Sequence, residues 1–460
     1  MRETEAVVLA AGKGKRMVSA LPKVLHQICG RPMIAYVLDT LVQVGITSPI
    51  VVVGHGGEQV RAALGEGVRH AVQDEQLGTG HAVMQALPHL EDYTGTVLII
   101  YGDVPFLRAE TIETLLAHHR SQAAAATILT DLRDDPSGYG RVLRDAHGNV
   151  RRIVEEPDAS PEEREVREVN AGMYAIEVGA LRDALRALTP ANAQGEYYLT
   201  DAISALLDGV HTVAAVVVAS SQEATGINSR AELAQAEAAM RAVLLGALME
   251  AGVGVIDPQH TYVHAGVRVG RDTILHPGTS LEGRTVIGEA CVIGPNARLV
   301  DAEIGDRVTI IASTVTASTV GEGTRIGPYS HLRPGVRLGR FVEVGNFAEM
   351  TRSTVGDRTK VHHMSYLGDA TVGERVNIGA GTITCNYDGK NKHQTIIEDG
   401  AFIGSDTMLI APVVIGREAV TGAGAVVKRD VPPRGVAVGV PARVISHRPA
   451  PEQPAPKRAE

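Results

Sequence analysis

The chain has 460 residues, of which 21% are charged and 44% are hydrophobic, and its formal net charge at pH 7 is −9. This length predicts two or three domains, and the composition is that of a folded globular protein. The acidic balance gives no support for a nucleic-acid-binding protein, whose usual mark is a broad basic surface. The three cysteines lack C-x-x-C spacing and are odd in number, so neither a zinc site nor a disulfide framework is indicated.

Hydrophobic segments are short throughout the sequence. No apolar run approaches the roughly 18 residues of a membrane-spanning helix, and the first residues lack the apolar core of a signal peptide. We therefore expect a cytoplasmic protein with no membrane contact. Aromatic residues make up only 3% of the chain, whereas glycine reaches 50 residues. Part of the core must therefore consist of small and β-branched side chains.

Residues 1–228 alternate continuous apolar runs with helical patterns, and we predict that they form one domain. The helical patterns lie at 33–45, 80–90 and 108–120. The expected strands are AVVLA (6–10), SPIVVVG (48–54), TVLIIYG (96–102), AAATILT (124–130) and VAAVVVA (213–219). This alternation predicts an α/β fold with a mostly parallel sheet that helices cover on both faces. Ligands of such sheets bind beyond the carboxyl ends of the strands.

The first expected strand runs into a glycine-rich basic loop, AAGKGKRM (10–17), and a Pro-Lys pair follows at 22–23. Glycines let backbone N–H groups turn toward an anion, and basic side chains add positive charge. The loop matches neither the P-loop pattern nor the dinucleotide-binding fingerprint, which needs a third glycine. Alone, it indicates either a polyphosphate site or a glycine-rich turn with a solvated basic rim.

Two further loops carry residues suited to a nucleotide site. Asp103 ends a buried run and offers a hard oxygen ligand for Mg²⁺, unless it only caps the next segment. The stretch QDEQLGTGHAV (73–83) places Gln73, Gly78 and Thr79 at a helix entrance. Their amides and hydroxyl can read the edge of a nucleobase, although a helix cap explains Thr79 equally well.

The second half of the chain follows a different period. Residues 229–251 have helical spacing and predict a connecting arm. Over 252–446 apolar residues recur every six positions, which is typical of a parallel β-helix with three short faces per turn. The rhythm breaks at 384–396, which predicts a loop that leaves the β-helix wall, and residues 447–460 are expected to be a disordered tail. The clearest six-residue series is Ile326, Leu332, Leu338, Val344 and Met350.

The motifs LAAGKGKRM, LPKVLH, EQLGTGHA, YGD, GYGRV, NAGMY, EYYLTD and GIN occur in an order that resembles the sugar-phosphate nucleotidyltransferases. Together with HHMSYLGD and TCNYDGKNK, they are similar to the bacterial family of bifunctional N-acetylglucosamine-1-phosphate uridyltransferases/glucosamine-1-phosphate acetyltransferases. The resemblance spans all but about the last fifteen residues. It implies a Rossmann-like nucleotidyltransferase domain followed by a left-handed β-helix of hexapeptide repeats.

The resemblance also implies two reactions that make UDP-N-acetylglucosamine for cell-wall and lipopolysaccharide precursors. In the first, the C-terminal domain transfers an acetyl group from acetyl-CoA to glucosamine 1-phosphate. In the second, the N-terminal domain transfers uridylyl from UTP to the product and releases pyrophosphate. The partners implied are these small molecules and, because the family's β-helices form trimers with acetyl-transfer sites between subunits, two further copies of the chain.

For the uridyltransferase site, the resemblance implies that Asp103 and Asn228 hold Mg²⁺. Arg16 would be a catalytic residue that stabilises the departing pyrophosphate, and Lys23 would reach a phosphate group. The remaining contacts to nucleotide and sugar would come from Leu9, Ala10, Ala11, Gly12, Gln73, Gly78, Thr79, Tyr101, Gly102, Gly140, Glu155 and Asn170, with Asn228 also touching substrate.

For the acetyltransferase site, the resemblance implies that His363 is the general base that removes a proton from the attacking amine. Histidine suits this role because imidazole exchanges protons near neutral pH. The neighbouring His362 is expected to face away. The sugar phosphate would be bound by Arg333, Tyr366 and Asn377. The acetyl-CoA site would be lined by Ala380, Asn386, Tyr387, Ser405 and Ala423.

The sequence departs from the family pattern at two phosphate contacts. Thr351 stands where the family usually has a lysine, and Arg352 follows it. An arginine is also missing before the final Val-Pro, and Arg443 is the nearby substitute. Whether Arg352 and Arg443 take over these contacts stays open.

Three alternatives compete with the two-reaction hypothesis. The first is a pyrophosphorylase whose β-helix only oligomerises or regulates. The second is a structural or binding β-helix fused to a degenerate nucleotide fold. The third is a hexapeptide-fold metalloenzyme, which needs three histidines on successive turns, and the adjacent His362 and His363 do not provide them.

Overall fold

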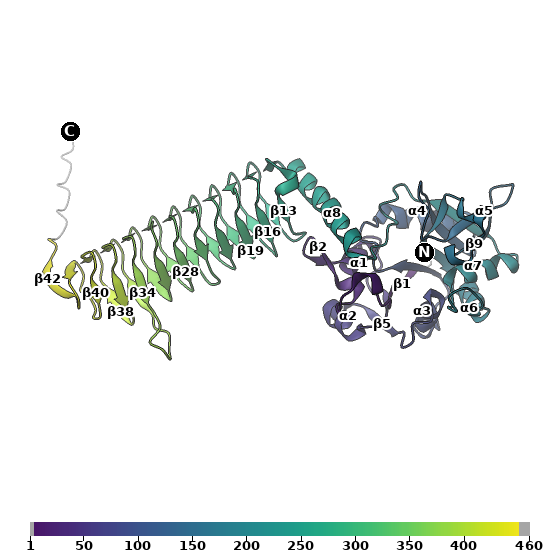
Figure 1. The fold of residues 1–460 in the computed structure, drawn as a ribbon, viewed down its shortest axis with the longest axis horizontal. Helices are drawn as coiled ribbons and strands as arrows, with labels where there is room; N and C mark the ends of the chain where they lie inside the picture. The colour runs from purple at the N-terminus through teal and green to yellow at the C-terminus, as the bar shows by residue number, and fades with distance from the viewer. Residues whose placement is uncertain (1–3, 450–460) are drawn as a thin grey trace, which may run out of the picture. The chain divides into compact units, whose positions relative to one another are not determined.

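The structure, a computed structural model, describes residues 4–449 and divides the chain into two compact units, Met1–Met240 and Arg241–Glu460 (Figure 1). The division falls inside helix α8 (Arg230–Glu250), where the sequence predicted a separate arm at 229–251. Glu237 in the first half of α8 accepts a hydrogen bond from Cys29 N, whereas Leu245 in the second half is buried in the β-helix core. The helix is therefore shared between the units.

The first unit is built on a sheet of nine strands, of which seven follow in the order β11-β7-β10-β6-β1-β4-β5. Its parallel pairs are β1 with β4 and β6, β4 with β5, and β7 with β11. β10 runs antiparallel between β6 and β7, and the hairpin β8–β9 pairs with it. The strands are β1 (Thr4–Ala10), β4 (Ile50–Val53), β5 (Arg69–Val72), β6 (Thr96–Tyr101), β7 (Ala126–Leu132), β8 (Arg141–Arg144), β9 (Val150–Val154), β10 (Glu168–Glu177) and β11 (Val213–Val217).

Helices cover both faces of this sheet (Figure 1). Neighbouring residues of a strand point to opposite faces, so Val7 and Val8 of β1 enter two different apolar cores. Val8 packs in the core that α1 and α4 complete, and Val7 packs in the core that α3, α6 and α7 complete. The helices are α1 (Met33–Gln43), α2 (Gly57–Leu64), α3 (Thr79–Ala86), α4 (Ala109–Ser121), α5 (Pro161–Arg164), α6 (Val178–Arg186) and α7 (Leu199–Asp208).

The second unit is a parallel β-helix made of short strands in three stacked sheets. One coil consists of β30 (Lys360–Val361) in the first sheet, β31 (Tyr366–Gly368) in the second and β32 (Ala370–Val372) in the third. The next coil starts with β33 (Asn377–Ile378), which pairs in parallel with β30. The first sheet runs from β12 (Gly254–Val255) to β41 (Gly435–Val438), and β42 (Arg443–His447) closes it antiparallel to β41.

The predicted six-residue period corresponds to the three sheets. Val344 pairs with Val361, and Val361 pairs with Ile378, each 17 positions further on. Each coil therefore holds about three six-residue faces, with a slip of one residue. The apolar residue of each face is buried on a narrow axis, where aromatic rings do not fit.

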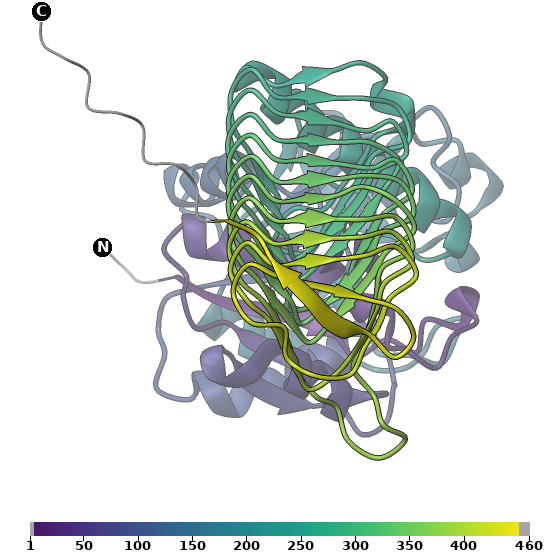
Figure 2. The ribbon, with the colours of Figure 1, turned by 90° about the vertical axis from the view of Figure 1, so that its left-hand side faces the viewer.

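The predicted loop leaves the β-helix between β34 (Ile383–Cys385) and β35 (Thr395–Ile397), and it projects from the stacked coils in Figure 2. The tail expected at 447–460 begins inside β42, and positions 450–460 lie outside the described residues. Within residues 4–449, every helix is too short or too polar to cross a membrane.

Candidate functional sites

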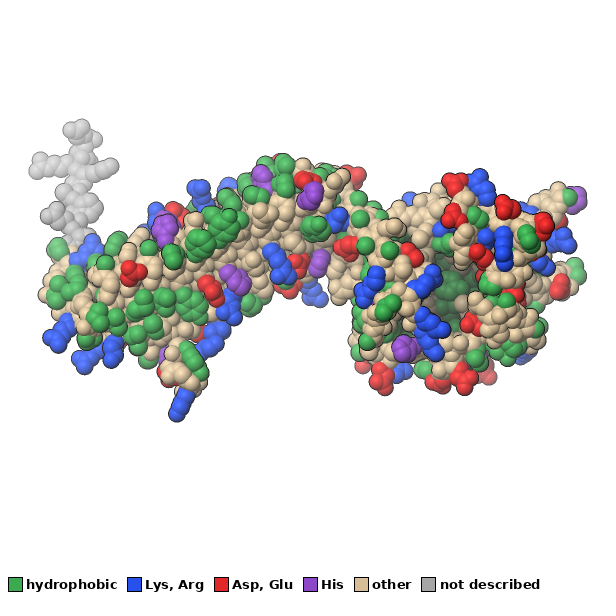
Figure 3. Space-filling model, in the orientation of Figure 1, with side chains coloured by type: hydrophobic (Ala, Val, Ile, Leu, Met, Phe, Trp, Pro, Cys, Tyr) green, Lys and Arg blue, Asp and Glu red, His purple; other side chains and the backbone are tan. Residues whose placement is uncertain are grey.

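A cavity of about 480 Å³ opens at the carboxyl ends of β1 and β6, where parallel sheets bind ligands. Figure 3 shows Lys and Arg side chains beside a hollow in this unit. The cavity brings together most of the residues predicted for the uridyltransferase site: Leu9, Ala10, Ala11, Gly12, Arg16, Lys23, Gln73, Gly78, Thr79, Tyr101, Asp103 and Asn228.

The basic loop approaches Lys23 so closely that it needs a glycine. Gly14 has a φ of 56°, in the left-handed region, and a Cβ there would lie 2.9 Å from Lys23 Cβ. A Cβ at Gly12 would meet nothing within 4 Å. Gly14 is therefore required by the turn, whereas Gly12 leaves open space beside the cavity.

Lys23, Asp103 and Asn228 meet inside this cavity. Lys23 Nζ donates to Asn228 Oδ1 over 3.0 Å and forms an ion pair with the Asp103 carboxylate. Ile227 N also donates to Asp103 O, which holds the Asn228 segment against the end of β6. The two side-chain oxygens therefore converge on one cation.

Positive charge dominates the cavity even though the chain as a whole is acidic. Four cationic side chains line it, Lys13, Lys15, Arg16 and Lys23, against the two carboxylates of Asp103 and Glu196. This local excess favours a small anion with several charges, such as a polyphosphate.

The loop that precedes α3 is held by hydrogen bonds to its neighbours. Buried Gln73 donates from Nε2 to Gly78 O over 3.0 Å. Thr79 Oγ1 accepts from Leu199 N over 3.0 Å, so its hydroxyl contacts the start of α7 and does not cap its own helix. Gly78 has a φ of 109°, and a Cβ there would lie 2.6 Å from Tyr197 O. The loop therefore packs tightly against residues 196–198.

Gly140, Glu155 and Asn170 form a second group, outside the lining of this cavity. Asn170 N donates to Gly140 O over 2.8 Å, and a Cβ at Gly140 would lie 3.2 Å from Glu155 Oε2. Glu155 also lines a second cavity of about 480 Å³. Gly102, predicted beside Tyr101, donates from its N–H to Leu9 O and joins β6 to β1.

Tyr101 links the two groups. It lines the first cavity, and its ring lies where a Cβ on Gly172 would collide with it at 2.2 Å. Burial raises the pKa of the Tyr101 phenol, and the nearby Glu155 carboxylate raises it further. Burial likewise raises the pKa of Glu155, against the hydrogen bond that Thr200 Oγ1 donates to Glu155 Oε1 over 2.9 Å.

Two polar lining residues were missed by the sequence analysis. Gln76 and Glu196 both face the first cavity. They belong to the quoted motifs EQLGTGHA and EYYLTD, but neither has a side chain whose chemistry alone marks a nucleotide site. Their positions depend on the contact between Gly78 and the segment that follows Glu196.

In the β-helix, four predicted residues lie on one corner of four successive coils. We define the His363 corner as the turns at 362–365, 379–382, 404–407 and 422–425. Backbone hydrogen bonds run along it, from Gly381 N to His363 O, from Asp406 N to Ala380 O and from Gly424 N to Ser405 O. The predicted residues on this corner are His363, Ala380, Ser405 and Ala423.

The other predicted residues of the β-helix lie elsewhere on the coils. Tyr366 is in the second sheet and Asn377 is in the first, so they occupy different faces of one chain. Arg333 forms an exposed ion pair with Glu349, with 3.0 Å between Arg333 Nη1 and Glu349 Oε1. Asn386 and Tyr387 begin the projecting loop after β34.

The neighbouring histidines differ in their contacts. His362 Nε2 lies 2.9 Å from Glu343 Oε2, whereas His363 is exposed on its corner, with its ring centre 5.7 Å from that of His362. In residues 4–449, no group of three or more His, Cys, Asp or Glu side chains is arranged to hold a metal ion.

The two units thus define a two-part transferase, with a nucleotidyltransferase fold around a cationic cavity and a hexapeptide-repeat β-helix. Residues 6–224 match the family described as MobA-like NTP transferase domain, and residues 394–429 match the bacterial transferase hexapeptide family. The chain belongs to the family of bifunctional GlmU proteins. It is 52% identical to "Bifunctional protein GlmU" of Heliobacterium modesticaldum, over 95% of this chain and 96% of that one. It is 50% identical to the protein of the same name from Geobacillus sp. (strain WCH70), over 94% of both chains.

These similarities confirm the predicted family and fold class. They extend across both units, so the likeness is to a whole two-part protein and not to one domain.

Proposed function

We propose that the chain makes UDP-N-acetylglucosamine in two steps, acetyl transfer in the β-helix and uridylyl transfer in the α/β unit. The observation that carries the proposal is the cationic cavity, in which the oxygens of Asp103 and Asn228 converge on one positive charge. Relatives named bifunctional, matched over both units, support the pairing of two activities.

In the uridylyl step, a phosphate oxygen of N-acetylglucosamine 1-phosphate attacks the α-phosphorus of UTP. The bond from that phosphorus to the bridging oxygen breaks, and pyrophosphate leaves. The attacking oxygen is already an anion, so no general base is needed, and the protein must align two polyanions and neutralise their charge. Arg16 and Lys23 supply positive charge, and Gln73, Gly78 and Thr79 hold the base.

The residues of the cavity fit a magnesium ion. Two hard oxygens, from Asp103 and Asn228, already face one cation, the Lys23 ammonium. Mg²⁺ commonly takes one or two protein oxygens and fills its other positions with water and phosphate. When bound, it supplies charge neutralisation at the phosphates. Lys23 would then be available to pair with a phosphate oxygen.

In the acetyl step, the amine nitrogen of glucosamine 1-phosphate attacks the carbonyl carbon of the acetyl thioester. His363 takes a proton from the amine, the carbon–sulfur bond breaks, and CoA leaves as the thiol after it regains a proton. Arg333, Tyr366 and Asn377 bind the sugar phosphate. Ala380, Asn386, Tyr387, Ser405 and Ala423 bind acetyl-CoA.

We further propose that the β-helix works as a homotrimer. His363, Tyr366 and Asn377 lie on a corner and two faces of two successive coils whose interior is filled by apolar side chains. They cannot surround one substrate within a single chain, because the outer surface of the coil is convex and ligand sites are concave. A second chain supplies the facing wall. The substrates proposed, UTP and acetyl-CoA, also favour a cytoplasmic location.

One experiment tests the two-step proposal. The purified chain receives glucosamine 1-phosphate, acetyl-CoA, UTP and Mg²⁺, and CoA release and pyrophosphate release are followed separately. Asp103→Ala should abolish pyrophosphate release and leave CoA release intact. Asp39→Ala, which removes an exposed partner of Arg31, is the matched control and should change neither. Wild-type chain that releases pyrophosphate but never CoA would show that the β-helix is not an acetyltransferase.

A further inference from the structure

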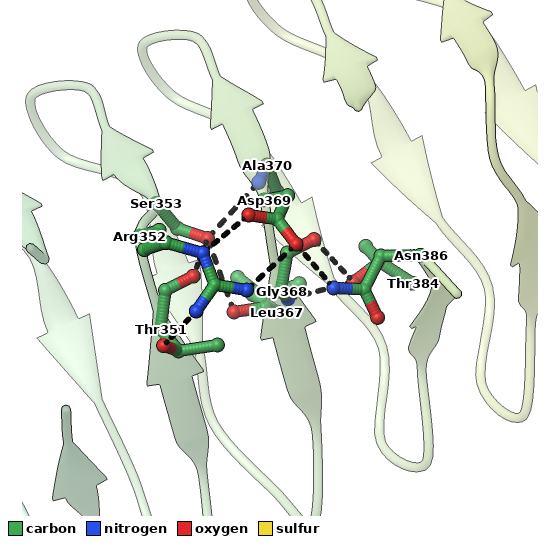
Figure 4. Close-up of polar contacts among 9 residues, drawn as sticks. All are labelled: Thr351, Arg352, Ser353, Leu367, Gly368, Asp369, Ala370, Thr384 and Asn386. Atoms are coloured by element: carbon green, nitrogen blue, oxygen red, sulfur yellow. Dashed lines mark hydrogen bonds and ion pairs between the residues drawn. The ribbon is translucent and has the colours of Figure 1, made fainter. Parts of the chain in front are cut away.

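Three polar side chains from three successive coils form a continuous chain at one corner of the β-helix (Figure 4). Arg352 follows β28 (Glu349–Thr351), Asp369 lies between β31 and β32, and Asn386 follows β34. Arg352 donates from Nε to Asp369 Oδ1 over 2.6 Å and from Nη2 to Oδ2 over 2.8 Å. Asn386 Nδ2 donates to the same Oδ2 over 2.5 Å. A single carboxylate is therefore shared by a guanidinium and an amide.

The backbone holds this carboxylate in place. Asp369 N donates to Thr351 O over 3.1 Å, and Thr395 N donates to Asp369 O over 3.2 Å. The hydrogen bonds from Arg352 lower the pKa of Asp369, and the hydrogen bond from Asn386 lowers it further. Asp369 is thus a fixed, ionised acceptor beside Asn386.

Asn386 closes the base of the projecting loop 386–394. Its N–H donates to Thr384 O over 2.9 Å, and its carbonyl accepts from His393 N over 2.8 Å. Only 7% of Asn386 is exposed, whereas 60% of Tyr387 is. The direction in which Tyr387 and the loop leave the wall therefore depends on how Asn386 is held.

Asp369 also determines which end of the Asn386 amide faces outward. A carboxylate can only accept hydrogen bonds, so the Nδ2 of Asn386 must face it. The Oδ1 then points away from Asp369, as Figure 4 shows. In this orientation Oδ1 can accept a hydrogen bond from an N–H group, such as one of the amides of a pantetheine arm.

Gly368 brings Asn386 next to Tyr366. A Cβ at Gly368 would lie 2.6 Å from both Asn386 Nδ2 and Tyr366 Oη. Any larger residue would push these two side chains apart. One residue proposed to bind acetyl-CoA and one proposed to bind the sugar phosphate therefore meet over this glycine, directly before Asp369.

We propose that Arg352 and Asp369 are positioning residues of the acetyl-transfer site that orient Asn386 for acetyl-CoA. This inference rests on the proposed acetyltransferase function. Arg352 acts through Asp369, and Asp369 acts on Asn386, so neither needs to touch substrate. The ion pair with Asp369 also argues against Arg352 as a substitute for the phosphate-binding lysine that is absent at buried Thr351, because Asp369 engages and neutralises its guanidinium.

The β-helix contains a matched control for this pair. Arg340 donates from Nε and Nη2 to Asp357 Oδ2 over 3.0 and 2.8 Å. Like Arg352 and Asp369, these residues are 17 positions apart and join successive coils. Asp357 accepts no hydrogen bond from a residue of the proposed site. Arg340→Ala therefore removes an ion pair that is equivalent in geometry but has no connection to Asn386.

The test is a double-mutant cycle on acetyl transfer. CoA release is measured at varied acetyl-CoA for the wild type, Asp369→Ala, Asn386→Ala and the double variant. Asp369→Ala should raise the KM for acetyl-CoA about tenfold in the otherwise wild-type chain. In the Asn386→Ala background the same substitution should raise this KM by less than about twofold, because the effects of coupled residues are not additive. Arg352→Ala should raise the KM for acetyl-CoA about fivefold. Arg352→Lys should raise it less, since lysine keeps the positive charge but lacks the forked pair of N–H donors of the guanidinium. Arg340→Ala should leave it unchanged.

Several results would overturn the inference. If Asp369→Ala raises the KM for acetyl-CoA equally with Asn386 present and with Asn386→Ala, Asp369 has a general structural role and does not act through Asn386. If Asp369→Ala does not raise this KM, Asp369 has no role in acetyl-CoA binding. Uridylyl transfer with supplied N-acetylglucosamine 1-phosphate and thermal unfolding report whether each variant folds. If Asp369→Ala does not fold, the same cycle is run with Arg352→Lys and Asn386→Ala, and additivity there rejects the coupling. Wild-type chain without any CoA release would instead reject the proposed acetyltransferase itself, and this inference with it.

Discussion

Lys23 Nζ donates to Asn228 Oδ1 over 3.0 Å, although 205 residues separate them in the chain. The same ammonium pairs with Asp103 at the end of β6. The loop after β1, the end of β6 and the segment before α8 are therefore tied together by one cation. This arrangement gives Asn228 a role that its sequence neighbourhood alone does not reveal.

The first prediction concerns Asn228 as a metal ligand. Asn228→Ala removes one of the two oxygens that converge on the cation, so Mg²⁺ should bind more weakly. We expect the Mg²⁺ concentration for half-maximal pyrophosphate release to rise about tenfold, the effect of losing about 1.4 kcal/mol of binding. The measurement is a Mg²⁺ titration at saturating UTP. Asn149→Ala, in an exposed turn with Asp145, is the control, and an equal shift there would remove Asn228 from the metal site.

The second prediction concerns the turn at Gly14. Gly14→Ala places a Cβ 2.9 Å from Lys23 Cβ in a backbone with positive φ, so Lys23 must move. We expect a clear increase in the KM for UTP and a loss of about 1–2 kcal/mol in the free energy of unfolding. Steady-state kinetics and denaturant unfolding measure the two effects.

Gly65 is the control that separates the effect of backbone strain from the effect of the close contact between Gly14 and Lys23. It has a φ of 67°, but a Cβ there would meet nothing within 4 Å. Gly65→Ala should lose at least as much stability as Gly14→Ala, because the ψ of Gly65 is −156° and lies outside the left-handed region, yet it should keep the KM for UTP of the wild type. If both variants raise this KM equally, the contact between Gly14 and Lys23 has no part in UTP binding.

The sequence predicted local features far better than contacts between distant segments. The six-residue period of Ile326, Leu332 and Leu338 was enough to identify a β-helix, because each coil repeats one simple packing rule. The five expected strands of the first unit are all present. Four strands of the same sheet, β5, β8, β9 and β10, were not predicted, and no local signal sets the antiparallel direction of β10.

The candidate sites show the same limit. The residues around Gly12, Gly78 and Asp103 do line one cavity, as strand ends in a parallel sheet predict. Gly140 and Glu155, by contrast, form a separate group, because their placement depends on the β8–β9 hairpin and on α7. The partner of Arg352 was also unpredictable, since Asp369 lies one coil away and only the coil length brings the two together.

The third prediction is a pH dependence of stability. Burial raises the pKa of Glu155 above its ordinary value. The folded state therefore keeps the Glu155 proton to a higher pH than the unfolded state does. As the pH rises from the ordinary glutamate pKa through the raised pKa of the folded state, ionisation of Glu155 lowers the free energy of unfolding. Glu155→Gln removes this cost, so the variant should be more stable than the wild type at pH 7 and equal to it below about pH 4.

Glu168 provides a control of opposite sign. Its burial opposes ionisation, but the hydrogen bonds from Arg144 and Thr130 give it a lowered pKa overall. Its charge therefore adds stability above the ordinary glutamate pKa, and this stability is lost as the pH falls through the folded value. Glu168→Gln should be less stable than the wild type at pH 7. Thermal unfolding from pH 3 to 8 measures both, and a Glu155→Gln variant less stable at pH 7 would contradict the first expectation.

The last prediction separates the two adjacent histidines. His363 is exposed on the corner that carries Ala380 and Ser405, whereas His362 Nε2 is held 2.9 Å from Glu343 Oε2. His363→Ala should lower CoA release at least about 100-fold, the usual contribution of a general base, while pyrophosphate release with supplied N-acetylglucosamine 1-phosphate is unchanged. His362→Ala should stay within about threefold of the wild type, because its ring is engaged by a carboxylate. Added imidazole should restore part of the CoA release of His363→Ala, since it can take the proton from the amine in solution. Equal losses in both variants, or no rescue by imidazole at any concentration, would mean that His363 supports the corner and does not accept the proton.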